Sequence, residues 1–362
     1  MSGINGANGS GPSPLGGARR HHPRRLLRLA TAAAVFVAVS ALGVTWLIWS
    51  VVGNVGRLEG VFAGLENTGR PAAAIQVIGA GEAGETAAPG TTILVAGTDS
   101  RSPVPTTGTD ALAPAWQYGA QRSDSLMLVH LTSDRQRAYV VAIPRDAWVE
   151  IPGFGQAKVN AAYSLGGPSL MVRTVEQLTD VRIDHVAVVD WHGLVTLIDS
   201  LGGLELTFAD TTVARDRVWG PGTYLLSGAE VRDYVSERLS LPNGDFDRIE
   251  RQQEVLRAIG EELLTRNVLG DPLSALSSAR AAARSVSVDE GLGITEMVRL
   301  AISVRNLDPV RVRYLTAPNL GIGWEGDQSV VHLDADALGG FFAAFESGQL
   351  ERWLTEHGDS AA

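Results

Sequence analysis

The sequence predicts a three-layer α/β/α domain with a central mixed β-sheet, preceded by one N-terminal transmembrane helix. Three observations lead to this fold class: short apolar runs of strand length, longer amphipathic segments between them, and one long uncharged stretch near the N-terminus. The chain has 362 residues, a length that suits one large domain with an anchor better than two domains.

The N-terminal segment carries the signal for the anchor. Five arginines lie between residues 19 and 28, and an uncharged stretch follows, LATAAAVFVAVSALGVTWLIWSVVGNV. This stretch exceeds the roughly 20 apolar residues that a bilayer core requires, and Trp46 and Trp49 lie at its far end, where aromatic rings favour the headgroup level. A cleaved signal peptide would have a shorter apolar region, of about 7–15 residues, and a small-residue cleavage site. Because basic residues stay on the cytoplasmic side, we expect a single-pass protein of the cell membrane with a cytoplasmic N-terminus and an extracytoplasmic domain.

The rest of the chain divides by composition into a stalk, a domain and a tail. Residues 57–90 are rich in Ala and Gly with one short apolar run, and the globular pattern begins at Thr91. The predicted organisation is a disordered basic cytoplasmic tail at 1–28, a transmembrane helix at 29–52, an extracytoplasmic stalk at 53–90, a globular domain at 91–353 and a flexible tail at 354–362.

Charge and cysteine content exclude several classes of function. The chain has 30 basic and 40 acidic residues; five of the basic ones are the N-terminal arginines, which leaves 25 against 40, a net charge of −15. We therefore expect a soluble acidic surface and no binding of nucleic acid. The chain has no cysteine, which excludes disulfides, zinc–thiolate sites and thiol nucleophiles.

The elements of the domain follow from hydrophobic periodicity. Apolar runs predict buried strands at 91–97, 125–133, 137–144 and 185–191, and the turn SDRQ makes the second and third an antiparallel hairpin. Apolar residues at helical spacing, with Pro or Gly at several of the ends, predict helices at 167–180, 193–203, 245–266 and 337–357.

Charged residues follow or precede three of the predicted strands. Asp99 and Arg101 come directly after the first strand, Asp124 precedes the second, and Arg145 and Asp146 follow the third. Strand ends in open α/β sheets are where binding sites collect, although strands also end in polar residues simply because they end at water. Because charged residues recur at three strand ends, we favour a single site at which these side chains converge. A Pro- and Thr-rich insertion at 102–116 is expected to form a flexible lip over it.

Two further segments have the residue types of a phosphate site. Lys158 is the only lysine and lies in a Gly-bounded loop, where its ammonium could meet a phosphate as a point charge; nucleotide composition explains its rarity equally well. On the helix that begins near Asp245, Arg248 and Gln252 are four residues apart and share a face. Guanidinium groups hold phosphate oxygens in two-point contacts, but a solvated, salt-bridged helix face fits this segment equally well.

The order of these motifs resembles the LytR-CpsA-Psr family of envelope glycopolymer transferases. A short basic tail and one membrane helix before the domain also match the family's usual layout. The matching segments, in the family's order between Thr91 and about Arg257, are ILVAGTDSR, RSDSLMLVHL, YVVAIPRD, KVNAAYSLGG, IDHVAVVDWHGLVTLIDSLGGLEL, GTYLLSGAEVRDYV and DFDRIERQQ.

The resemblance implies that residues 91–353 form a catalytic domain, which transfers a glycopolymer from a polyprenyl diphosphate carrier, as a phosphodiester, onto peptidoglycan or a related wall acceptor and releases polyprenyl phosphate. It implies Mg²⁺ held by Asp99 and Asp124. It places the diphosphate on Arg122, Arg145, Lys158, Arg238, Asp245, Arg248 and Gln252. Among these residues, the resemblance implies catalytic roles for Asp99, Arg145, Arg238 and Arg248, with Asp99 as the hypothetical base that deprotonates the sugar hydroxyl.

One position departs from the family's pattern. The family has an Arg-x-Arg pair after Tyr-Val, whereas this chain has YVSERLS, with Ser236 in place of the first arginine. Arg251 or Arg232 is a candidate to supply the missing charge. Three functions therefore stay open: a Mg²⁺-dependent transferase, a lipid diphosphate hydrolase that uses the same site, and a non-catalytic envelope protein that binds lipid or polymer. The lipid requires an apolar cavity, for which Val186–Val189, Leu194 and Leu197 are candidates, although core packing is the default interpretation of each.

Overall fold

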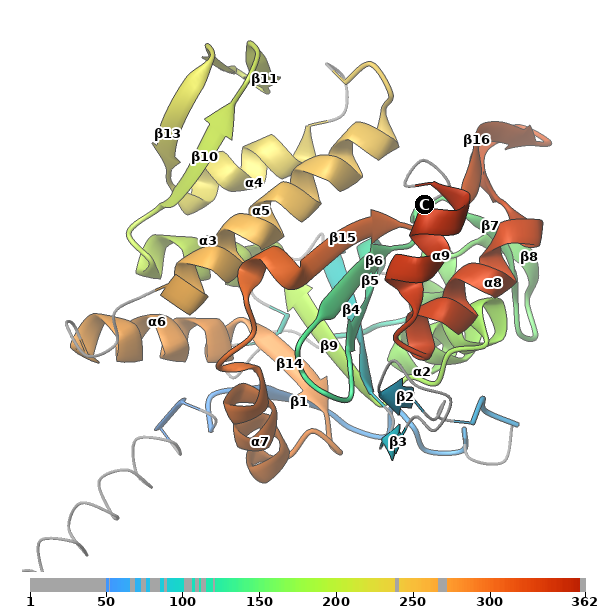
Figure 1. Cartoon of the computed structure of the whole chain (residues 1–362). Coiled ribbons are helices and arrows are strands. Elements are labelled where there is room, and N and C mark those ends of the chain that lie inside the picture. The colour runs from blue at the N-terminus through green and yellow to red at the C-terminus, as the bar shows by residue number, and fades with distance from the viewer. Residues whose placement is uncertain are drawn as a thin grey trace, which may run out of the picture. The chain divides into compact units, whose positions relative to one another are not determined.

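The computed structural model describes most of the chain from residue 50 onward (Figure 1). The described residues are 50–51, 53–65, 69–72, 76–78, 85–87, 90–100, 106–107, 111, 115–119, 121–237, 241–265 and 272–358. The predicted tail at 1–28 and the predicted transmembrane helix, apart from residues 50 and 51, lie outside this description. None of the described helices is long and apolar enough to cross a membrane.

A mixed β-sheet forms the centre of the domain, as predicted. Among the described residues it has seven strands, in the order β1 (Gly56–Leu58), β14 (Val286–Asp289), β9 (His185–Asp190), β4 (Thr91–Ser100), β5 (Gln121–Leu131), β6 (Ala138–Ala142) and β15 (Val312–Thr316). β4 pairs with β9 in parallel and with β5 antiparallel, and β5 and β6 form the predicted hairpin. The sheet therefore holds β4 and β5, on which Asp99 and Asp124 lie, at its middle.

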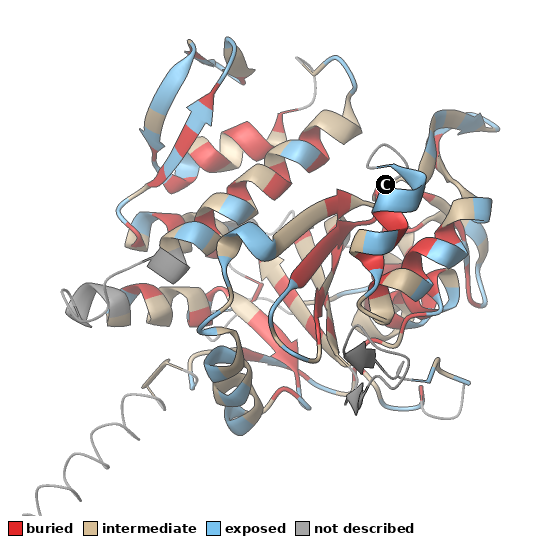
Figure 2. Ribbon diagram, in the orientation of Figure 1, coloured by how far each residue is buried: buried red, intermediate tan, exposed pale blue. Residues whose placement is uncertain are grey.

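Helices cover both faces of this sheet (Figure 1). Their bounds are α2 (Asn160–Thr179), α3 (Trp191–Ser200), α4 (Gly228–Ser236), α5 (Asp245–Thr265), α6 (Pro272–Arg284), α7 (Ile294–Val304), α8 (Ala335–Glu346) and α9 (Leu350–His357). Leu94 on β4 packs in one core with side chains of α2, α8 and α9, whereas Val95 faces α3, α4 and α5. This alternation follows from the two-residue period of a strand. Figure 2 shows the buried residues gathered in the central strands and on the helix faces that cover them.

Pairs of short strands form separate two-stranded sheets outside the central sheet. They are β2 (Gln76–Ile78) with β3 (Glu85–Ala87), β7 (Trp148–Ile151) with β8 (Gly155–Lys158), β10 (Leu204–Phe208) with β13 (Gly222–Leu226), β11 (Thr212–Ala214) with β12 (Arg217–Trp219), and β16 (Asn319–Glu325) with β17 (Gln328–Leu333). Lys158 is the last residue of β8, so it lies on a hairpin and not in the loop that its glycine-rich surroundings predicted.

Local sequence explains the helices that position the site. Asp190 begins α3 as its N-cap, and its carboxylate accepts a hydrogen bond from the Gly193 N–H at 2.8 Å. Two acidic residues in the first turn of α5 suit the positive end of the helix dipole. Arg248, Gln252 and Val255 recur at helical spacing and are buried, so one face of α5 turns toward the sheet.

The structure corrects both boundaries of the predicted domain. Residues assigned to the stalk form β1, and Leu58, Val61 and Leu65 join the core. Arg57 also donates a hydrogen bond to the Leu292 carbonyl at 2.6 Å, so this part of the predicted stalk belongs to the folded unit. At the other end, α9 runs to His357, past the predicted start of the tail.

Other element boundaries were wrong because tertiary pairing overrides local pattern. β4 extends to Ser100 and β5 begins at Gln121, so Asp99 and Asp124 lie within strands and not beyond their ends. A register shift between Gly97 and Thr98 lets the pairing continue past the apolar run. The predicted helix at 337–357 is two helices, broken near Gly348, which has a φ of 72°.

Candidate functional site

Arg145 lies at the centre of a charged cluster where β6 ends. Its Nη1 donates a hydrogen bond to Asp124 Oδ1 at 2.5 Å, and its Nε lies 3.1 Å from Asp245 Oδ1. The Arg145 side chain is 12% exposed, as is that of Asp124. The guanidinium therefore joins β5 to the first turn of α5, two segments far apart in sequence.

Arg248 approaches the same two acidic residues from inside α5. Its Nη2 lies 2.7 Å from Asp245 Oδ1 and donates a hydrogen bond to the Asp124 carbonyl at 3.0 Å. The side chain is only 2% exposed, so the hydrogen bond to the Asp124 carbonyl ties α5 to β5 at a nearly buried position, and the ion pair with Asp245 lies within α5 itself. A buried charge needs this pairing, because an uncompensated one costs several kcal/mol.

Lys158 joins the cluster through Asp146, a strand-end carboxylate to which the sequence analysis gave no binding or catalytic role. Lys158 Nζ lies 3.3 Å from Asp146 Oδ1, and Asp146 Oδ2 lies 3.7 Å from Arg145 Nε. The position of Asp146 directly after Arg145 in the sequence was the signal that could have assigned it to the site. Burial alone lowers the pKa of Arg145, but the carboxylates of Asp245, Asp124 and Asp146 outweigh it and raise the pKa above its usual value. Arg145 is thus a permanent cation in this cluster.

Several predicted site residues lie outside the described side chains. For Asp99 and Arg122 only the backbone is described, and Arg238 lies outside altogether. Asp99 pairs with Arg122 across β4 and β5, two residues from Asp124. Diagonal neighbours in a sheet are about 7–8 Å apart, so the backbone brings the predicted acidic pair to one place.

The described residues contain no group of three acidic or histidine side chains positioned to hold a metal ion. Their donor types nevertheless suit Mg²⁺, which takes carboxylate oxygens and usually only one or two of them. Three carboxylates gather around Arg145, and within the described part of the chain Asp245 Oδ2 is buried without a hydrogen-bond partner. Asp124, with Asp99 on the neighbouring strand, therefore fits the predicted metal pair.

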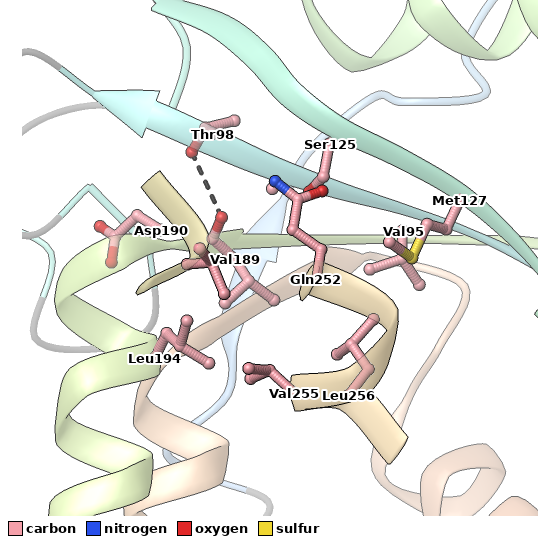
Figure 3. A pocket seen from close by; sticks show the side chains of 12 residues that line it. Val95, Thr98, Ser125, Met127, Val189, Asp190, Leu194, Gln252, Val255 and Leu256 are labelled. Atoms are coloured by element: carbon pink, nitrogen blue, oxygen red, sulfur yellow. Dashed lines mark hydrogen bonds between the residues drawn. The ribbon is translucent and has the colours of Figure 1, made fainter. Parts of the chain in front are cut away.

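An apolar cavity of about 100 Å³ adjoins the charged cluster (Figure 3). It lies between the sheet and helices α3, α4 and α5. Its lining includes Val95, Met127, Val189, Leu194, Val255 and Gln252. Figure 3 shows the Gln252 side chain extending from α5 into the space below Ser125. Gln252 Nε2 is buried and has no hydrogen-bond partner among the residues that the structure describes, so within this part of the chain the cavity presents one unused donor.

The structure separates cavity from core among the candidate apolar residues. Val186 and Val188 belong to the core between the sheet and α2, whereas Val189 and Leu194 line the cavity. Leu194 also packs against the core around α4 and α5, so the default interpretation as core holds for it, and Val189 alone of the two is described only as cavity lining. Leu197 packs against the core around α4 and α5.

Asp190 ties part of the predicted lip to the wall of the cavity. Its Oδ2 accepts hydrogen bonds from the Thr106 N–H at 2.6 Å and the Thr107 N–H at 3.2 Å. Both threonines are buried, so this portion of the insertion is fixed and not a flexible lip. The sequence analysis missed Asp190, because a helix N-cap has no distinctive partner in sequence.

Neither candidate replaces the arginine that Ser236 displaces. Arg251 Nη1 donates hydrogen bonds to the carbonyls of Val213 and Tyr234, both at 3.2 Å, and its guanidinium stacks over the Tyr234 ring. Arg232 lies 3.7 Å from Asp233. Arg251 thus joins α5 to α4 and β11, while Arg232 pairs with its neighbour.

Comparison with known proteins supports the resemblance read from the motifs. The model of the LytR_cpsA_psr family matches residues 71–342. The cell wall biosynthesis protein LcpA of Corynebacterium glutamicum is 30% identical over 342 residues, which cover 85% of this chain and 63% of LcpA. The probable cell wall biosynthesis protein LcpB of the same organism is 32% identical over 219 residues, 60% of this chain and 52% of LcpB. The chain thus spans less than two thirds of the length of both relatives.

Solved structures share the fold. Protein gbs0355 from Streptococcus agalactiae superposes with a TM-score of 0.61 at 22% identity and covers 73% of this chain and 88% of its own. TagT, a Bacillus subtilis protein solved bound to LI-WTA, gives a TM-score of 0.57 at 22% identity, with 77% and 96% covered. With the family match over most of the chain, this mixed α/β fold and its conserved order of motifs, the protein belongs to the LytR-CpsA-Psr family.

Proposed function

We propose that this protein is a membrane-anchored, extracytoplasmic phosphotransferase. It attaches a glycopolymer carried on polyprenyl diphosphate to peptidoglycan or a related wall acceptor and releases polyprenyl phosphate. Among the relatives, LcpA carries the name cell wall biosynthesis protein, and TagT was solved with LI-WTA bound. Membership of the same family supports a role in transfer of a cell wall glycopolymer.

One observation carries the proposal: the charged cluster and the apolar cavity share a boundary. Asp124 belongs to the cluster, and the next residue, Ser125, lines the cavity. Arg248 belongs to the cluster, and Gln252, one helical turn later, lines the cavity. A ligand that spans this boundary has a multiply charged head and an apolar chain, which describes a lipid-linked diphosphate.

The cluster suits cleavage of a diphosphate, which depends on positioning and charge stabilisation more than on covalent chemistry. An acceptor hydroxyl oxygen attacks the phosphorus that bears the glycan, and the bond from that phosphorus to the oxygen of the lipid phosphate breaks. Arg145 and Arg248 hold phosphoryl oxygens and stabilise the charge that moves onto the leaving lipid phosphate. Asp99 accepts the hydroxyl proton. Mg²⁺ bound by Asp99 and Asp124 would neutralise part of the diphosphate charge.

To bind phosphate, the cationic side chains of the charged cluster must give up some of their present contacts with carboxylates. Arg145 uses Nη1 on Asp124 and faces two other carboxylates, so phosphate oxygens compete for donors that are already engaged. Lys158 and the uncommitted amide of Gln252 add donors on two sides of Arg145. The predicted residues Arg122 and Arg238 complete the binding of the diphosphate.

The membrane anchor is part of the proposed mechanism. A transmembrane helix at 29–52 holds the domain at the outer leaflet, in the same layer as its lipid-linked substrate. Confinement to one surface raises the local concentration of both partners in the way that tethering does.

The test is metal-dependent release of polyprenyl phosphate from a polyprenyl-diphosphate-linked oligosaccharide by the full-length protein in detergent. We expect release with Mg²⁺ and little release with EDTA. Release excludes a protein that only binds lipid or polymer. No release under either condition, with donor binding intact, would establish that non-catalytic alternative and contradict the proposal.

A further inference from the structure

A second hollow, of about 320 Å³, adjoins the β7–β8 hairpin, whose last residue is Lys158. Its walls are the β7–β8 hairpin, the end of α2, β17 and the start of α8. The apolar cavity belongs to the layer of α3 and α5, whereas this groove belongs to the layer of α2 and α8. The two hollows therefore offer separate places for two substrates.

The lining of the groove combines two amides, one carboxylate and one imidazole with one large aromatic ring. Glu150, Gln156 and Gln177 are exposed, and their side chains make no hydrogen bond or ion pair within the described part of the chain. Trp148 forms part of the wall with apolar Leu333 beside it. None of the described residues that line the groove is Arg or Lys. This chemistry does not suit a phosphate. It suits a neutral polyhydroxylated chain, which hydrogen-bonds to amides and lays its apolar ring faces on an indole.

The register of the β7–β8 hairpin connects the groove to the cluster. Trp148 is directly opposite Lys158, and Glu150 is directly opposite Gln156. Residues opposite each other, and those two positions along, share one face of a hairpin. A single face therefore carries the cluster's lysine at one end and groove-lining side chains along its length.

The backbone fixes the opposite wall to the cluster as well. The Val331 N–H donates a hydrogen bond to the Asp146 carbonyl at 2.9 Å, and the next residue, His332, lines the groove. Asp146 is the carboxylate that pairs with Lys158. Both walls of the groove are thus joined to residues of the charged cluster.

We propose that this groove binds the saccharide chain of the acceptor and directs one hydroxyl toward the phosphate cluster. This inference rests on the proposed transferase function, and it assigns the acceptor to the α2–α8 side while the lipid occupies the α3–α5 side. The glycan of the donor is also rich in hydroxyl groups. The experiment therefore compares binding of the acceptor saccharide with binding of the donor glycan.

The experiment measures binding to the full-length protein in detergent by isothermal titration calorimetry. One arm uses soluble glycan fragments released from peptidoglycan by a muramidase, and the other uses the donor glycopolymer freed of lipid. The variants are Gln156→Ala with Gln177→Ala, which removes two amides, and Ala335→Trp, which fills the groove from an exposed position at the start of α8. Gln136→Ala, an exposed amide in the turn between β5 and β6, is the matched control.

We expect the peptidoglycan fragments to bind and the double variant to weaken that binding by about ten-fold, since each lost hydrogen bond reduces affinity several-fold. Ala335→Trp should abolish binding, and Gln136→Ala should leave it unchanged. Metal-dependent release of polyprenyl phosphate to water should stay at the wild-type rate in all three variants. Equal binding by wild type and both groove variants would overturn the proposal, as would a groove-dependent preference for the donor glycan. If the wild type releases no polyprenyl phosphate, the proposed transferase function is contradicted. The binding measurements then still show whether the groove binds the acceptor saccharide.

Discussion

The guanidinium of Arg145 donates a hydrogen bond to the Asp124 carboxylate at 2.5 Å, across the junction of two neighbouring strands. The two side chains are equally shielded, each 12% exposed. This contact places a permanent cation beside a predicted metal ligand. In the proposed function, the diphosphate and the metal ion both contact the protein at the Arg145–Asp124 pair.

Replacing Arg145 by Lys should remove the planar fork while keeping the charge. We expect kcat/KM for transfer to fall roughly 100-fold, as for loss of one preorganised donor to a developing oxyanion. The measurement is transfer rate against donor concentration, with Arg137→Lys, an exposed arginine on the neighbouring turn, as control. Near-normal transfer by Arg145→Lys would contradict a direct role for the guanidinium.

Asp245→Ala should destabilise the fold, because it removes the carboxylate that lies 2.7 Å from Nη2 of the nearly buried Arg248. We expect the free energy of unfolding to fall by about 3 kcal/mol. Glu296→Ala provides a matched control: Glu296 and Arg299 are also three residues apart on a helix, but Arg299 is 68% exposed. That change should cost less than about 1 kcal/mol. Urea unfolding of the two variants measures the difference, and equal losses would show that burial of Arg248 adds nothing.

Leu194→Trp should fill the apolar cavity and weaken binding of the lipid-linked donor. The loss should grow with the length of the prenyl chain, because a long chain needs the volume that the indole takes. KM measured with short-chain and long-chain donors tests this, beside Ile302→Trp on the exposed face of α7. A loss that is independent of chain length would place the lipid elsewhere.

His130 should make the stability of the fold depend on pH. Burial, with a smaller contribution from Arg135, lowers the pKa of His130 from 6.5 to about 4, so the folded protein holds the ring neutral. Between these values the unfolded chain binds the proton and the folded chain does not, so stability falls as pH drops from 6.5 toward 4. The loss attributable to this residue at pH 4.5 is about 2–3 kcal/mol.

The His130 prediction is tested with His130→Asn, which keeps a polar atom near Thr92 Oγ1, the partner of His130 Nδ1 at 2.9 Å. Urea unfolding at pH 7 and pH 4.5 should show a smaller acid loss in the variant than in the wild type. An identical acid loss would assign the pH dependence to other groups.

Local pattern predicted the elements whose stability is decided locally. The apolar run of β6, the alternation of β9 and the helical period of α5 are each visible within one segment. β1 could not be predicted, because a three-residue strand acquires its identity only by pairing with β14. The extension of β4 past Gly97 likewise depends on β5 across a register shift.

For the candidate site, the residues alone indicated side-chain types that suit phosphate and metal binding. The family resemblance indicated which of these residues belong to one site. The structure brings Asp124, Arg145, Lys158, Asp245 and Arg248 together from four segments. Asp146 was noted only as one of the charged residues at strand ends and received no role, because a carboxylate beside an arginine has the pattern of an ordinary surface. The division between cavity and core at Val188 and Val189 could not be predicted either, since both faces of the sheet are covered by helices and both read as apolar.

The most direct test of the central claim is mass spectrometry of the acceptor after incubation with the full-length protein, donor and Mg²⁺. The account predicts peptidoglycan fragments heavier by one glycopolymer and one bridging phosphate, in amounts that match the polyprenyl phosphate released, and no such product with EDTA. Release of polyprenyl phosphate with unmodified acceptor, and free glycopolymer phosphate in solution, would show a hydrolase and contradict it.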